Sequence, residues 1–323
     1  MKKRLLGVFV TAVWLLSSCA IPVPQPSENI PLERNGALTP QQSDLILDDT
    51  HDLLAAADSA KNSALLTARV SGDAAAIRQA EYRVDKAGAG ALSVIPRETL
   101  AVYGTAGESW PRTMVVVTEE VDAQSTPLVM MWVQDNVEDN YELRNWASML
   151  PGGVMPAMPS LSVGASQMSL DASGLVMTPG DALDLYVKIL NEGSSSESAD
   201  AFAPDGYRDR MFSARAALVG TAKARGGTYT DVVKARPEET FVFLTDEGDA
   251  LVLAPITITS TFSVPGAQLT LPKRDSALFS GTLRDRAVYT YRDFIVFRVP
   301  VEGSEVLPEI IAADHFLTAV KTK

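Results

Sequence analysis

The sequence predicts an α+β fold of two tandem domains, each with helices packed on an antiparallel sheet. A Thr-Pro helix start occurs twice, at Thr39 and at Thr178, and helical periodicity follows each one. Strand-like segments come after the helices both times, ending in residues 287–301, where apolar and polar side chains alternate. We therefore expect one domain over residues 37–170 and a second over residues 171–323.

Length and composition agree with this organisation. The chain has 323 residues, which corresponds to two domains at about 150 residues each. Hydrophobic residues make up 46 % of the chain, which is typical of a globular protein and not of a disordered one.

The N-terminus carries a different pattern. Basic residues at positions 2–4 precede an apolar run over residues 5–16, and the sequence Leu-Ser-Ser-Cys ends at Cys19. This is the pattern of a secretory signal, and the run is shorter than the roughly 20 residues that span a bilayer. The four-residue ending resembles the bacterial lipobox, in which the cysteine is lipidated and becomes the mature N-terminus. We expect a signal peptide over residues 1–18 and a lipid on Cys19.

A proline-rich segment separates Cys19 from the first helix. Residues 19–36 contain four prolines and show no apolar periodicity, so we expect an extended tether. The predicted location is the extracytoplasmic side of the cell membrane, with the membrane contacted through the lipid on Cys19. Cys19 is the only cysteine, so no thiol remains for a disulfide.

The charge of the chain limits its partners. The net charge is −12, and cleavage before Cys19 removes Lys2, Lys3 and Arg4 and no acidic residue, which leaves −15. Because nucleic-acid binders need cationic surface against phosphates, we expect no nucleic-acid partner. A protein of the cell envelope remains a possible partner.

The elements of the first domain follow from local signals. Thr39 is a good helix N-cap, Pro40 suits the first helical position and Gln42 completes a capping box. The expected helices are residues 40–64 and 74–86, and the expected strands are residues 113–121, 128–133 and 141–150.

The second domain repeats the order. Helices are expected over residues 180–190 and 207–223, and strands over residues 240–245, 250–254, 256–264 and 287–301. Residues 287–301 are expected to bury one face only. Residues 306–323 fit a returning strand or a terminal helix, and we favour the strand.

The order of helices before a meander is similar to the cystatin-like roll, also called the nuclear-transport-factor-two-like fold. That resemblance implies helices in the concave side of a curved sheet. The whole chain also resembles uncharacterised actinobacterial surface lipoproteins, a resemblance that implies no particular activity.

Sites of catalysis or metal binding are hard to find in this sequence. His51 and His315 lie beside acidic residues, but a zinc site needs three or four ligands, so we expect both on a solvated surface and no metal. No Gly-x-Ser-x-Gly or Ser-x-x-Lys nucleophile motif occurs. Phosphate-loop and dinucleotide fingerprints are absent, and we expect no cofactor.

Tryptophan and methionine gather in the first domain. Met130, Trp132 and Trp146 are the candidate lining of a small apolar pocket between helix and sheet. We favour the other interpretation, an ordinary core, because most apolar side chains are buried without further purpose.

These observations favour a membrane-anchored, non-enzymatic binding or accessory module for a protein or a small apolar ligand. The alternative is an exported hydrolase that acts on cell-envelope material, with catalytic groups that converge only in the folded chain.

Overall fold

The structure is a computed structural model that describes residues 35–107, 109–120 and 126–322. Residues 34–323 belong to one compact unit. The predicted signal peptide, the lipidation site at Cys19 and most of the tether lie outside the described residues. Among the described residues, no helix combines the length and the apolar character needed to cross a bilayer.

The helices occur in two groups and one short addition. They are α1 (Pro40–Ala60), α2 (Gly72–Lys86), α3 (Pro179–Glu192), α4 (Gly206–Lys223) and α5 (Lys273–Leu278), with 3-10 turns at Ser63–Ala68, Gly193–Ser195, Ala199–Ala201 and Pro237–Glu239. The capping box predicted at the start of α1 is confirmed, because Thr39 and Gln42 exchange hydrogen bonds there.

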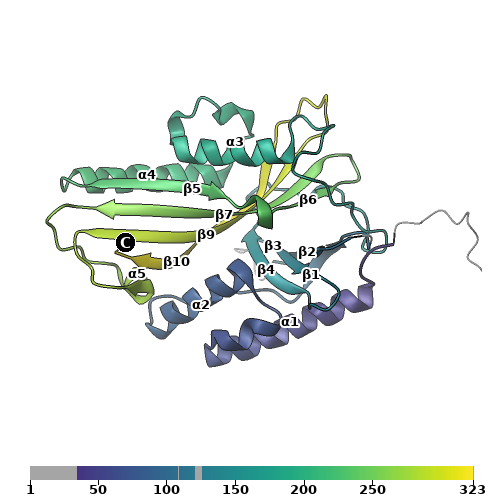
Figure 1. Cartoon of the computed structure of the whole chain (residues 1–323), viewed down its shortest axis with the longest axis horizontal. Coiled ribbons are helices and arrows are strands. Elements are labelled where there is room, and N and C mark those ends of the chain that lie inside the picture. Colours follow the sequence, from purple (N-terminus) through teal and green to yellow (C-terminus); the bar gives the residue numbers. More distant parts are fainter. Residues whose placement is uncertain (1–34, 108, 121–125, 323) are drawn as a thin grey trace, which may run out of the picture. The chain divides into compact units, whose positions relative to one another are not determined.

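The strands form two separate sheets (Figure 1). The first has the order β1-β2-β3-β4 and is antiparallel throughout, with strands β1 (Thr99–Gly104), β2 (Arg112–Thr118), β3 (Leu128–Gln134) and β4 (Glu142–Ser148). The second has the order β5-β7-β9-β10-β8, and β6 pairs with β7. Its strands are β5 (Thr228–Ala235), β6 (Phe241–Leu244), β7 (Ala250–Ser263), β8 (Phe279–Ser280), β9 (Arg286–Val299) and β10 (Glu309–Lys321). The predicted α+β class is confirmed, as is the returning strand near the C-terminus.

Three hydrophobic clusters show how the helices and the two sheets pack into layers. Helices α1 and α2 pack on one face of the first sheet, and α3 packs on one face of the second. The remaining faces of the two sheets pack against each other through side chains such as Val129, Met131, Leu253 and Val296. The layers therefore run from helices to sheet to sheet to helices.

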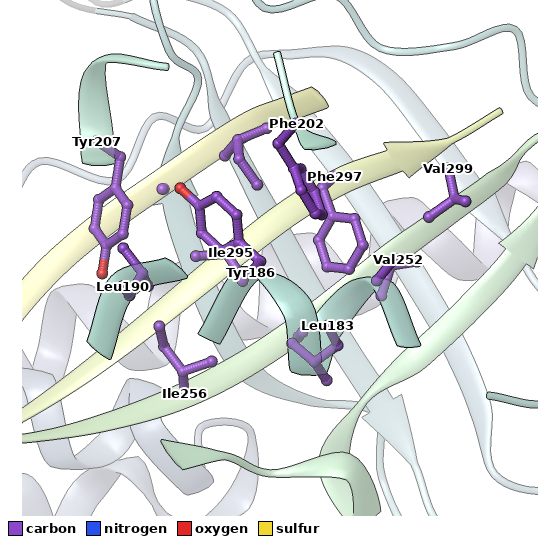
Figure 2. Close-up of a cluster of buried hydrophobic side chains, with 14 of the residues drawn as sticks. Leu183, Tyr186, Leu190, Phe202, Tyr207, Val252, Ile256, Ile295, Phe297 and Val299 are labelled. Carbon is purple, nitrogen blue, oxygen red and sulfur yellow. The ribbon is translucent and has the colours of Figure 1, made fainter. Parts of the chain in front are cut away.

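Figure 2 shows the outer core of the second sheet. Leu183, Tyr186 and Leu190 of α3 lie over Ile256 of β7 and over Ile295 and Phe297 of β9, and all six are buried. The positions are spaced as one helix face must be, at i, i+3 and i+7.

Strand β9 differs from the prediction of one buried face. Phe294 and Val296 point away from α3 and are buried against the first sheet, with at most 1 % of each exposed. The prediction was wrong for this stretch because the second face is covered by the other sheet, which local alternation does not reveal.

Other differences concern strand boundaries. Residues 250–254 and 256–264, expected as two strands, form the single strand β7. Strands β1 and β5 and helix α5 were not expected. Helix α2 also contacts β10 and α5, so elements from both ends of the chain pack together, and the domain division at residues 170 and 171 stays a prediction.

Candidate functional site

A pocket of about 340 Å³ opens on the α4 side of the second sheet. We call it the aromatic pocket. Helix α4 and the residues after it contribute Leu218, Thr221 and Arg225, and the strands contribute Tyr229, Phe262, Tyr289 and Tyr291. The rest of the lining is Leu269, Thr270, Leu271, Pro272 and Asp275, from the segment that leads into α5 and from α5 itself.

Strand register brings the four rings together. Tyr229 of β5 is directly opposite Phe262 of β7, and their ring centroids are 6.5 Å apart at an angle of 59°. Tyr289 and Tyr291 are two residues apart on β9, so they share a sheet face. Ser260 is opposite Tyr289 in the register.

The tyrosines of the pocket are protonated hydrogen-bonding groups at neutral pH. Burial raises the pKa of Tyr289 to about 12, with a further contribution from the negative charge of Asp275. Burial likewise raises the pKa of Tyr229 and Tyr291 above the usual value of 10. A ligand in the pocket therefore meets neutral phenols.

An arginine of helix α4 ties the helix to the sheet. Arg215 Nε lies 2.9 Å from Asp231 Oδ2 on β5, and Arg215 Nη2 donates to the carbonyl of Leu190 at 2.7 Å. This contact ties α4 to both β5 and the end of α3. It fixes the wall from which Leu218 and Thr221 face the pocket.

Two charged side chains of the pocket have no partner among the described residues. Asp275 makes no hydrogen bond or ion pair there, and burial raises its pKa, which the neighbouring Arg274 partly offsets. Arg225 is exposed at the rim and its guanidinium is likewise unpaired within the described part.

A buried polar network lies directly behind Tyr291. His315 Nδ1 is 2.7 Å from Asp293 Oδ2, and the same carboxylate oxygen accepts a hydrogen bond from the Tyr207 hydroxyl. The Asp293 side chain is fully buried, whereas 33 % of the His315 side chain is exposed. His315 was expected on a solvated surface, and the residue is indeed exposed, but the structure also gives it a buried carboxylate partner.

His51 lies where the sequence did not place it. It is buried, with 7 % exposed, so the prediction of a solvated helix face was wrong. Its Nε2 has no hydrogen-bond partner among the described residues. Burial lowers the pKa of His51, and the positive charge of Arg97 adds to the effect. His51 lines a second pocket of about 330 Å³, together with Arg78 and the segment around Ser93.

The structure brings the candidate residues Met130, Trp132 and Trp146 together in the core between the first sheet and helices α1 and α2. Each is at most 1 % exposed. Trp132 Nε1 donates to Thr50 Oγ1 at 3.2 Å, and the Arg78 guanidinium lies 5.8 Å from the Trp146 ring centroid. None of the three lines a pocket described above.

Comparison with known proteins identifies the family of this chain but assigns no activity to it. The model of a family described as Domain of unknown function (DUF8094) matches residues 34–321. The chain belongs to this family. No curated protein and no solved structure matches the chain.

In this member of the family, the described residues contain no group of three or more His, Cys, Asp or Glu side chains placed to hold a metal ion. Four pockets in the described part of the chain contain at most one carboxylate each. The paired carboxylates of a glycoside hydrolase are therefore not found in these pockets.

One feature of the sequence could have indicated the polar network around Asp293. Asp293 interrupts the apolar face of residues 287–301, and a carboxylate at a buried strand position needs partners. That position alone indicates a polar site next to Tyr291. The partners Tyr207 and His315 lie 86 and 22 residues away, so spacing along the chain does not name them.

Proposed function

We propose that this chain is a binding module whose aromatic pocket holds a small, largely apolar ligand. The observation that carries the proposal is the pocket itself, which combines four aromatic rings with a few polar groups. Its volume of about 340 Å³ lies within the range of small-molecule sites, roughly 300–1,000 Å³.

We further propose that the module is a surface lipoprotein, anchored through Cys19 on the extracytoplasmic side of the membrane. The signal pattern and lipobox support this location. An anchored module presents its pocket to the cell envelope, where it would act alone or with a protein partner.

We also propose that each half is a cystatin-like roll. Two helices precede an antiparallel sheet in the first half and a mainly antiparallel sheet in the second, which supports this. Superposition of residues 37–170 on residues 171–323 should pair α1 and α2 with α3 and α4. A best superposition that matches no helices would contradict it.

An exported hydrolase of cell-envelope material is the second candidate, and the His315–Asp293 pair favours it. A buried carboxylate that orients an imidazole is the arrangement of a general base. Binding is better supported, because no serine or threonine hydroxyl among the described residues hydrogen-bonds to His315.

The test of binding is a methyl NMR titration of the protein with cyclohexanol, a neutral apolar probe. We expect the methyl signals of Leu218 and Leu271 to shift, and those of the exposed Leu45 to stay unchanged. Thr221→Trp should fill the pocket and abolish the shifts. Ala216→Trp, on the opposite side of the same helix, is the matched control and should preserve them. Shifts that survive in Thr221→Trp would exclude this pocket as the binding site.

A further inference from the structure

The aromatic pocket contains a carboxylate that makes no direct polar contact among the described residues, although the charge of its chain neighbour Arg274 acts on it. Asp275 is partly buried, and no described residue hydrogen-bonds to it or forms an ion pair with it. A buried charge is costly when it is unpaired, and proteins ordinarily supply a counter-ion. A cationic group on a ligand would be a suitable counter-ion at this position.

The residues around Asp275 indicate which kind of cation the pocket would bind. Four rings line the same pocket, from Tyr229, Phe262, Tyr289 and Tyr291. Aromatic faces attract cations through the ring quadrupole, and several rings together recognise alkylated ammonium groups. One carboxylate is too few ligands for a calcium site, which takes six to eight oxygens.

An alkylated ammonium also suits the pocket's polarity. Its charge is spread beneath methyl groups, so it leaves water more easily than a compact primary ammonium does. The acidic chain, at −12, attracts cations to its surface.

Resting on the proposed binding function, we propose that the ligand is a small alkylated ammonium compound. Its cationic head contacts the aromatic rings of the pocket, and the Asp275 carboxylate is the counter-ion. The exposed Arg225 at the rim lies on the solvent side and is not required for the cation.

The experiment compares choline with 3,3-dimethylbutan-1-ol, its neutral isostere, by calorimetric titration of the protein. We expect choline to bind roughly tenfold more tightly than the isostere. Asp275→Asn should remove most of that advantage, the remainder coming from the rings, and should leave the affinity for the isostere unchanged. Arg225→Gln is the matched control, because it removes a positive charge from the same pocket. This variant should bind choline at least as tightly as the unaltered protein. Thermal unfolding of both variants reports that they are folded.

The pH dependence provides a second readout. The carboxylate form of Asp275 binds the cation, so choline affinity should fall as the pH is lowered through the raised pKa of Asp275. The affinity of Asp275→Asn should not change over the same range.

The outcomes separate this inference from the proposed function. Equal affinity for choline and the isostere overturns the ammonium ligand, while the neutral probes still support an apolar pocket. Tighter binding of 3,3-dimethylbutanoate, lost in Arg225→Gln, also overturns it and indicates an anionic ligand. Absence of choline binding overturns it as well, and the cyclohexanol titration then decides the proposed function separately.

Discussion

Tyr291 stacks on His315, with ring centroids 3.9 Å apart and planes 16° from parallel. Tyr291 lines the aromatic pocket, and His315 pairs with the buried Asp293 behind it. The pocket wall is thus fixed by a polar network that reaches Tyr207, near the start of α4. Pocket and network form one structural unit, built by strands β5, β7, β9 and β10 together with helix α4.

The lipid anchor gives the first prediction. Cys19→Ala should abolish lipidation and leave an unprocessed or soluble protein, because the acylated thiol is absent. Partition between detergent and aqueous phases measures this. A cleaved Cys19→Ala protein that still enters the detergent phase would show that the lipobox interpretation is wrong.

A buried ion pair between the two halves gives the second prediction. Asp73 of α2 is 3 % exposed and pairs with Arg236, while Arg292 Nη1 lies 3.4 Å from it. Asp73→Ala leaves these cations without their carboxylate and should lower the free energy of unfolding by about 3 kcal/mol. Lys188→Gln, which breaks an exposed pair within α3, should cost under about 0.5 kcal/mol. Urea denaturation measures both, and equal losses would contradict the prediction.

The candidate residues of the first sheet give the third prediction. Trp146 is 1 % exposed and contacts Phe316 and Arg78, so Trp146→Ala should lower the free energy of unfolding by about 3–5 kcal/mol. Met130→Leu conserves volume and should cost less than about 1.5 kcal/mol. Neither change should alter the cyclohexanol shifts of Leu218. A loss of those shifts in folded Met130→Leu would link this core to ligand binding.

The pH dependence of stability gives the fourth prediction. The pKa of His51 is lowered from 6.5 on folding, so the unfolded chain takes up a proton at a higher pH than the folded one does. The contribution of His51 to stability is therefore complete above pH 6.5 and is lost as the pH falls toward the lower folded value. Denaturation curves at several pH values should show a flatter dependence in His51→Gln. An unchanged slope in that variant would contradict a neutral, buried His51.

Local signals were sufficient for most helices and for the apolar strands. Thr39 and Gln42 define a helix start within four residues, and residues 128–133 are apolar enough to be read as a strand without knowing their neighbours. Strand β5 has no such signal, since Thr228, Thr230 and Val232 are exposed and only Val233 is fully buried. Its strand state depends on pairing with β7, a non-local contact.

The site was harder to predict than the fold, because it too depends on non-local contacts. Tyr229, Phe262 and Tyr289 come from three strands, and only the register between them places the rings in one pocket. The burial of His51 requires the segment around Ser93 to return against α1. Neither relationship produces a periodic pattern or a characteristic residue spacing in the sequence.

The layer between the two sheets has a consequence for synthesis. Ribosomes release the strands in chain order, so β1 to β4 can pair before β7, β9 and β10 exist. Val129 and Met131 then face water until Leu253, Val296 and Ile311 arrive to cover them. Until the C-terminal half is in place, the N-terminal half thus carries an uncovered apolar face, and such a face favours aggregation.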